Sequence, residues 1–268
     1  MGGTGPKTGP NTRPDMGPDR PIILHVEWED IGAALRAGWR DFLAAPHFGL
    51  FFASVYVAGG WLVYWAFTAQ GQLWWVLPAS AGFPILGPFI ACGLYEVSRR
   101  LAAGEALTPN AVFASIFGQK DRQIPAMAAV IVVFFLFWNF LAHMLFALFL
   151  GNAVMTNISN SIAVFLTPEG LAMLAIGMGV GAIFAALLFA LTVVSLPMLM
   201  VREVDFVTAM LTIFALVRES PVVLLGWGAL VRALLFAGML AGFFGLFVVL
   251  PIAGHATWHL YTRAVEWH

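Results

Sequence analysis

The chain has 268 residues, of which 61% are hydrophobic and only 10% are charged, with 24 Phe and 10 Trp. Soluble domains contain about 45–50% apolar and about 25% charged residues, so the composition excludes an ordinary soluble fold and predicts a polytopic membrane protein. The net charge of −1 argues against a nucleic-acid partner, and the single cysteine, Cys92, excludes an intrachain disulfide and a cysteine-based metal cluster.

The N-terminal segment 1–22 is rich in Gly and Pro and lacks the apolar core of a secretory signal peptide. Too few apolar residues are present to form a packed core, so we expect a disordered tail. The remaining residues, 23–268, are expected to form one transmembrane domain.

Long apolar stretches fill most of that domain. A membrane helix needs about 20 apolar residues, and five stretches reach this length: 48–69, 74–98, 125–150, 170–200 and 221–265. The last would form a helix of about 67 Å, which is too long for one crossing. Because "AGFFG" at 241–245 offers a turn, we divide it into 221–242 and 245–265, which gives six spans.

The distribution of basic residues favours six spans over five. Of the 13 Lys and Arg residues, 12 fall in the N-terminal tail, in the loops 99–124 and 201–220, or at the C-terminal end of the last span (Arg263), and all of these lie on one side in the six-span arrangement. The positive-inside rule then predicts that both termini are cytoplasmic. A five-span arrangement would place Arg263 outside. We therefore expect a multi-pass protein of a bacterial inner membrane.

A repeated layout precedes three of the spans, in which a short amphipathic segment is followed by a proline. The segments are 30–46, 110–125 and 205–221, and the prolines are Pro46, Pro125 and Pro221. In the first segment the spacing puts Ile31, Leu35, Trp39 and Phe42 on one face, with Arg36, Arg40 and Asp41 facing away, as in a helix lying at the membrane surface. The predicted fold is an all-α polytopic membrane protein with six transmembrane helices as three hairpins, each preceded by a short interfacial helix.

Two stretches carry a family resemblance: "GPFIACGLYEVSRRLAAGE" (87–105) and "PIAGHATWHLYTRAV" (251–265). They resemble a family of bacterial predicted integral membrane proteins, domain of unknown function 2189. The resemblance extends over about residues 30–265, and the GHATWH ending with its Tyr and Arg is the most specific element. It implies a membrane protein without an assigned activity.

Polar residues inside the predicted spans are the candidate site residues, because such residues are costly in a membrane. Arg232 lies 11 residues into the fifth span and His255 lies 10 residues into the sixth, which puts both about 15 Å deep on adjacent helices. We expect them to share one polar site, whose further candidates are His259, Asn139 and Glu96. Alternatively, Arg232 is structural and binds backbone carbonyls freed where Pro84 or Pro251 interrupts a helix.

The two histidines of the sixth span have several readings. His255 and His259 lie one helical turn apart, so they could contribute to a metal site, or one of them could bind a haem axially. A tetrahedral metal site needs more ligands than this pair provides, and His143 lies too far along its span to join them. We therefore expect no metal or cofactor, with the pair mainly packing or anchoring the helix end.

Two functions fit these features. The first is a non-catalytic accessory or assembly factor for a larger membrane complex, whose partners are the bilayer and possibly other integral membrane subunits. The second is a small-solute or ion transporter or channel whose path passes Arg232 and His255. An enzyme is not expected, because Ser54, Ser80 and Ser195 have no neighbouring histidine in the sequence.

Overall fold

The computed structural model describes residues 21–70, 76–118, 124–151, 165–202 and 204–267. Within these ranges the side chains are described except at 66–70, 76–86, 190 and 206. The predicted tail thus falls almost wholly outside the described residues, as do residues 71–75, 119–123 and 152–164.

Helices make up nearly all of the described chain. In chain order these are α1 (Trp28–Ala44), α2 (Pro46–Gln70), α3 (Val76–Ala103), α4 (Pro109–Gly118), α5 (Ile124–Leu150), α6 (Pro168–Thr192), α7 (Ser195–Val201), α8 (Phe206–Glu219), α9 (Pro221–Leu240) and α10 (Leu246–Ala264).

The helix ends follow from local sequence. Pro46, Pro168 and Pro221 each open a helix at a position where the missing N–H would have had no partner within the helix. The side chain of Asp205 caps α8 by accepting a hydrogen bond of 2.9 Å from the backbone N–H of Thr208. Gly104, after α3, has a φ of 65°, a conformation that glycine adopts at little cost.

Short helices occur at the three amphipathic segments of the repeated sequence layout. The short helices α1, α4 and α8 each precede a long helix, and the long helices contact one another as α2 with α3, α5 with α6, and α9 with α10. The predicted turn between the last two helices is present, with Gly242 and Phe243 both at positive φ. In contrast, the predicted span 170–200 is not one helix, because α6 ends at Thr192 and the separate helix α7 begins at Ser195.

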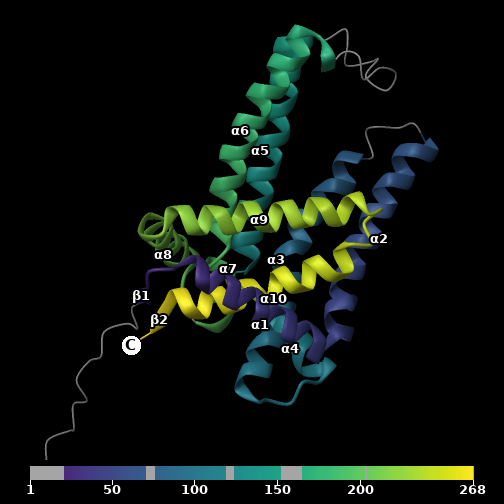
Figure 1. Ribbon diagram of the computed structural model, residues 1–268. Coiled ribbons are helices and arrows are strands. Elements are labelled where there is room, and N and C mark those ends of the chain that lie inside the picture. Colours follow the sequence, from purple (N-terminus) through teal and green to yellow (C-terminus); the bar gives the residue numbers. More distant parts are fainter. Residues whose placement is uncertain (1–20, 71–75, 119–123, 152–164, 203, 268) are drawn as a thin grey trace, which may run out of the picture.

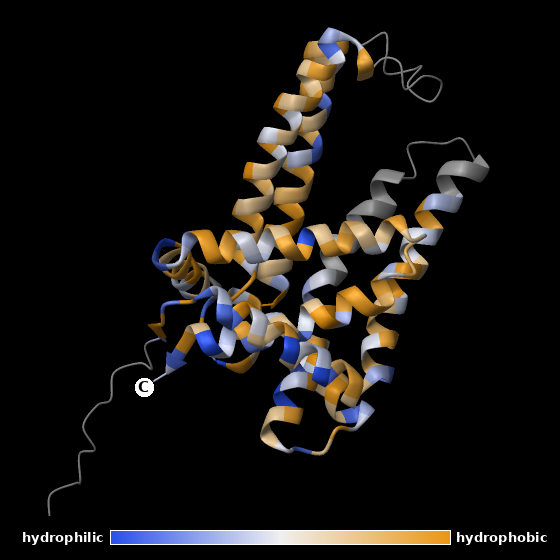
Figure 2. Ribbon diagram, in the orientation of Figure 1, coloured by the Kyte–Doolittle hydropathy of each residue, from blue (hydrophilic) through white to orange (hydrophobic). Residues whose placement is uncertain are grey.

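The long helices do not all run in the same direction. Figure 1 shows the α5–α6 hairpin projecting away from the rest of the molecule, while α9 runs across its base and α10 lies beside α1. The hairpin is largely hydrophobic along its length, whereas hydrophilic residues gather around α1, α8 and the C-terminal end of α10 (Figure 2).

Two short strands hold the ends of the described chain together. β1 (Pro21–Ile23) pairs antiparallel with β2 (Val265–Trp267), so Pro21 and Ile22 belong to a strand and not to the tail in which the sequence had placed them. Because residues 21–23 and 265–267 are in contact, they lie on the same side of a membrane, and the chain between them must cross it an even number of times.

Four helices of the described residues are long and apolar enough to cross a membrane. They comprise Pro46–Trp65 of α2, Ile124–Leu150, Pro168–Phe189 and Pro221–Leu240. The helix α10 is not among them, because its C-terminal half contains His255, His259 and Arg263. The side chains of α3 before Gly87 lie outside the described residues, so six spans remain a prediction.

The core of the protein is built around α10 and not around the most apolar helices. Nine α10 residues are buried, among them Trp258 and Tyr261, and Trp258 stacks on Tyr95 of α3 with ring centroids 6.4 Å apart. By comparison, almost none of the apolar stretch Pro168–Phe189 of α6 is buried inside the protein. Thus α10 organises the fold, while α6 presents its surface outward.

Candidate functional site

The polar residues of α10 reach their partners because α1 crosses this helix very closely. A Cβ atom at Gly38 would lie 2.7 Å from the backbone N of Ala256 and 2.8 Å from the carbonyl oxygen of Ile252. Only glycine permits such an approach of two backbones. The crossing brings the acidic flank of α1 against the histidines of α10.

The first contact in this region joins α1 to α10. His259 Nε2 lies 2.7 Å from Asp41 Oδ2, and only 20% of the His259 side chain and 15% of the Asp41 side chain are exposed. Burial would raise the pKa of Asp41, but hydrogen bonds from His259 and Ser98 and electrostatic interaction with the two histidines hold this pKa below its ordinary value. The sequence prediction that Asp41 faces away with the arginines is therefore wrong.

The second contact joins α10 to α3. Ser98 Oγ lies 2.8 Å from His255 Nδ1, and both residues are fully buried. The other ring nitrogen of His255, Nε2, has no hydrogen-bond partner among the described residues. We refer to Asp41, Ser98, His255 and His259 as the polar cluster; it links three helices at the centre of the protein.

The polar cluster contains the residue types of a serine hydrolase but not their arrangement. In such a site one histidine joins the serine to the acid, whereas here Ser98 contacts His255 and Asp41 contacts His259. Ser98 is also fully buried, and it does not line the cleft described below. In this arrangement Ser98 has no access to a substrate.

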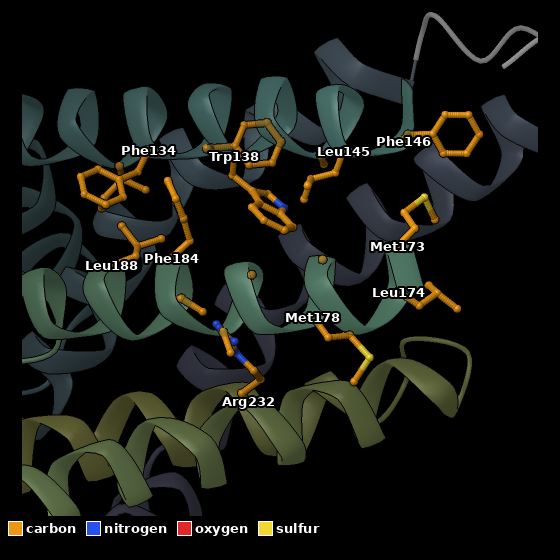
Figure 3. A pocket seen from close by; sticks show the side chains of 17 residues that line it. Phe134, Trp138, Leu145, Phe146, Met173, Leu174, Met178, Phe184, Leu188 and Arg232 are labelled. Carbon is orange, nitrogen blue, oxygen red and sulfur yellow. The ribbon is translucent and has the colours of Figure 1, made fainter. Parts of the chain in front are cut away.

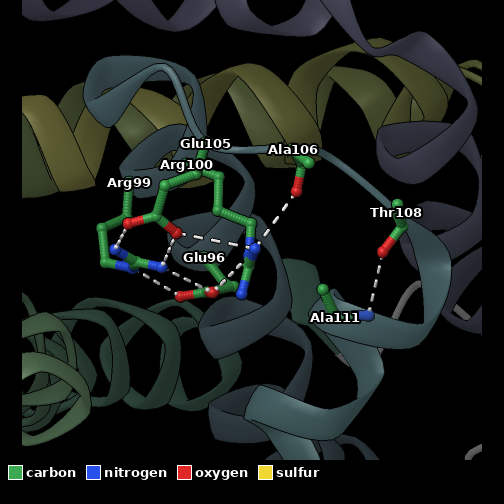
Figure 4. Close-up of polar contacts among 7 residues, drawn as sticks. All are labelled: Glu96, Arg99, Arg100, Glu105, Ala106, Thr108 and Ala111. Carbon is green, nitrogen blue, oxygen red and sulfur yellow. Dashed lines mark hydrogen bonds and ion pairs between the residues drawn. The ribbon is translucent and has the colours of Figure 1, made fainter.

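Glu96 belongs to an ion-pair network at the end of α3 (Figure 4). It is almost fully buried and accepts hydrogen bonds from Arg99 Nε at 2.8 Å and Arg100 Nε at 2.6 Å. Arg99 in turn donates to both carboxylate oxygens of Glu105, which lowers the pKa of this exposed residue. Glu96 is thus fully engaged in joining the end of α3 to the loop that follows.

Asn139 lies apart from the polar cluster, on α5. The side-chain Nδ2 of Asn139 donates to the backbone oxygen of Phe135 at 2.8 Å. The backbone carbonyl oxygen of Asn139 lies 2.7 Å from His143 Nδ1. Both contacts are within one helix. They satisfy these polar groups locally and do not form a site with another element.

Arg232 lines a cleft between α5 and α6 with a volume of about 660 Å³. The Arg232 side chain extends from α9 toward α6 (Figure 3), and the other lining residues are apolar. Trp138 of α5 packs against Gly181 of α6, where a Cβ atom would lie 2.9 Å from the indole ring. Among the described residues no hydrogen bond or ion pair engages the Arg232 guanidinium. We call this feature the α5–α6 cleft.

The surroundings of Arg232 and His255 differ. His255 is buried against α3, whereas Arg232 is exposed in the α5–α6 cleft, which His255 does not line. The described polar contacts do not join the two residues into the shared site that their matched depths had predicted. Residues at matched depths lie side by side only where the spans are upright and parallel, whereas α9 crosses the base of the hairpin (Figure 1).

Two residues of the polar cluster, Asp41 and Ser98, were not identified as site residues from the sequence. Their only signal is that each is polar and lies within four residues of buried apolar positions, such as Phe42 and Leu94. Helical periodicity indicates which face of a helix a residue occupies but not which helix it meets. In the described part of the chain, no three His, Cys, Asp or Glu side chains are grouped as metal ligands.

Part of the chain is similar to a known protein family. Residues 76–200, from the start of α3 to the end of α7, match a family model described as "Predicted integral membrane protein (DUF2189)". The match confirms the family resemblance and includes "GPFIACGLYEVSRRLAAGE", whereas "PIAGHATWHLYTRAV" lies beyond the matched segment. No curated protein and no solved structure matches the chain. Residues 76–200 are thus similar to a family of predicted integral membrane proteins whose function is unknown.

Proposed function

We propose that the protein is a non-catalytic accessory or assembly factor for a larger membrane complex and that the α5–α6 hairpin is its partner-binding element. The observation that carries this proposal is the exposed guanidinium of Arg232 in an apolar cleft. A charged group at membrane depth is costly and requires a polar partner, which lipid chains do not provide. A subunit of a larger complex would provide it.

The shape of the molecule supports the same proposal. The protein consists of a core around α10 and a projecting hairpin. The apolar residues of α6 are hardly covered by the rest of the chain. Gly177 and Gly179 of α6 face open space. Small residues on an open helix face allow the close approach of another transmembrane helix.

The absence of catalysis is part of the proposal. The one serine–histidine pair of the polar cluster is buried without a route for a substrate, and its acid contacts the other histidine. These contacts have a clear structural role, because they fasten α1 and α3 to α10. The polar cluster and the ion-pair network of Glu96 are accordingly taken as the scaffold of the accessory factor.

The alternative function, a transporter or channel with a polar site at Arg232 and His255, receives no support from the surroundings of these residues. A path between them would have to pass through the packed region around His255, which is fully buried. The family match supports a location in a membrane. The finer assignment to a bacterial inner membrane with cytoplasmic termini rests on the distribution of basic residues.

Purification from the source membranes in a mild detergent tests the proposal. We expect the protein to elute with one or a few integral membrane proteins in a fixed ratio, and the sample to show no absorption band of haem. A monodisperse protein free of partners would contradict an accessory role and would return attention to transport. A haem absorption band would show that the expectation of no cofactor is wrong.

A further inference from the structure

The α5–α6 cleft has the length of a transmembrane helix. It extends on α5 from Ile131 to Phe146 and on α6 from Met173 to Leu188, so each side covers 16 residues of helix, with 15 rises between the first and the last. At a rise of 1.5 Å per residue this corresponds to about 22 Å, which is most of a hydrocarbon core of about 30 Å. A second helix lying along the hairpin would be in contact with it over about four turns.

The charge of the cleft lies near its middle. Arg232 extends toward the part of α6 that contains Met178 and Phe184, and the other labelled side chains that line the cleft are apolar (Figure 3). An occupant that matches this pattern is apolar at both ends and has an acceptor for a guanidinium at its centre. A carboxylate is the strongest such acceptor, because it can accept two hydrogen bonds from one guanidinium.

We propose that the α5–α6 cleft receives a transmembrane helix of another protein and that an Asp or Glu near the centre of this helix pairs with Arg232. The inference rests on the proposed accessory function and specifies its partner. The pairing offsets the free-energy cost of placing each charge within the membrane. It also fixes the register of the two helices, because the two charged groups must lie at the same depth.

A second copy of this chain does not supply the carboxylate. The sequence contains no Asp or Glu in 46–95, 124–168, 170–202 or 220–265. Within the long helices this leaves Glu96, which is bound by Arg99 and Arg100, and Glu169, which lies in the first turn of α6. Neither lies near the middle of a span, so the partner is a different protein.

A lipid headgroup fits the cleft less well than a helix. The phosphate of a lipid lies at the membrane surface, whereas Arg232 meets α6 about halfway along Pro168–Thr192. A lipid bound there would have to draw its headgroup toward the centre of the bilayer. A carboxylate on a transmembrane helix needs no such displacement.

Synthetic peptides test the pairing with the full-length protein in zwitterionic lipid vesicles. The probe is a fluorescent transmembrane peptide of Leu and Ala with one central Glu, and its association is measured by energy transfer. Matched peptides have Gln at the same position or the Glu near one end. We expect the central-Glu peptide to bind about tenfold or more tightly than either matched peptide, because only its carboxylate can pair with Arg232.

Variants of the protein identify the site. Arg232→Leu should abolish the preference for Glu over Gln, and Arg232→Lys should retain part of it. Gly177→Leu should block binding without disturbing the fold, because Gly177 lines the cleft and a Cβ there meets open space. Its matched control is Gly179→Leu, on the same helix and equally open but outside the cleft lining, which should bind as the wild type does.

Three results would overturn the inference: equal affinity of the wild type for the Glu and Gln peptides, a preference that survives Arg232→Leu, or equal effects of Gly177→Leu and Gly179→Leu. Binding of labelled phosphatidylglycerol that depends on Arg232 and excludes the peptide would assign the cleft to lipid instead. Failure of the peptides while a native complex is still recovered from membranes refutes this inference alone. If no native partner is recovered from membranes at all, the proposed function itself is refuted.

Discussion

At the scale of single residues, the contact between Asp41 and His259 holds α1 on α10. Asp41→Asn removes a charge-assisted hydrogen bond of 2.7 Å in a largely buried position. We expect the free energy of unfolding to fall by about 1–3 kcal/mol. Thermal unfolding in detergent measures this loss. The control Glu29→Gln removes the same charge from an exposed position of α1 and should leave the melting temperature unchanged.

The contact between Asp41 and His259 also predicts that the stability of the folded protein depends on pH. Because the pKa of Asp41 is lower in the folded protein than in the unfolded chain, its contribution is fully present above the unfolded pKa of about 3.9 and is lost as the pH falls below it. The difference in melting temperature between the wild type and Asp41→Asn should therefore be large at pH 6 and should shrink toward about pH 3. A difference that is constant over this range would show that Asp41 is not ionised in the folded protein.

The buried pair of Ser98 and His255 predicts strong coupling between two substitutions. Ser98→Ala removes the side-chain hydrogen-bond partner of His255 Nδ1 beside an already unpaired Nε2, so we expect it to cost about 1–3 kcal/mol. Adding His255→Leu removes the buried polar ring. The double variant should then lose clearly less stability than the sum of the two single variants. Additive losses in a denaturation experiment would contradict the hydrogen bond.

At the scale of helices, the close crossing of α1 and α10 predicts opposite effects of two similar substitutions. Gly38→Ala would bring a Cβ atom to 2.7 Å from the backbone of α10, which cannot move aside without displacing the helix. We expect a loss of about 1–3 kcal/mol. Gly32→Ala, also in α1, meets only the Arg36 side chain at 3.4 Å, so it should be neutral or slightly stabilising because alanine favours the helix. Equal melting temperatures for the two variants would rule out the crossing.

The exposed surface of α1 is relevant to its predicted place at the membrane surface. Trp39 and Leu43 are 45% and 58% exposed and lie on the same side as the exposed Arg36 and Arg40. The predicted apolar face is in fact divided, since Ile31 and Phe42 are buried in the protein. A membrane-facing stripe with arginines beside it therefore stays a prediction, and it now rests on Trp39 and Leu43.

The positions of the helices could be predicted from the sequence better than the contacts between them. Apolar length and the prolines placed most helix ends within two or three residues, and a helix of 45 residues was too long to accept, so the break at 241–245 was predictable. The break after Thr192 was not, because "VVSL" is as apolar as the helix it ends. His255 and His259 were recognised as candidates, but their partners on α1 and α3 depend on how helices cross.

At the scale of the whole molecule, the pairing of the two ends constrains the topology. With an even number of crossings and basic residues on one side, reporter fusions after Arg100, Arg218 and His268 should all report the cytoplasm. A fusion after Ser159 should report the opposite side. A fusion at His268 that reports the side opposite to an N-terminal fusion would contradict both the strand pairing and the six-span arrangement.

Photo-cross-linking in the source membranes can detect whether another membrane protein docks in the α5–α6 cleft. Met178 lines the cleft and is 73% exposed, whereas Ile176, on the same helix, is 46% exposed and lies outside the cleft lining. A photoreactive residue at Met178 should join one discrete protein, and the adduct should disappear with Arg232→Leu. The same residue at Ile176 should give no such adduct. Adducts with lipid alone at Met178, or one pattern shared by both positions, would contradict docking in this cleft.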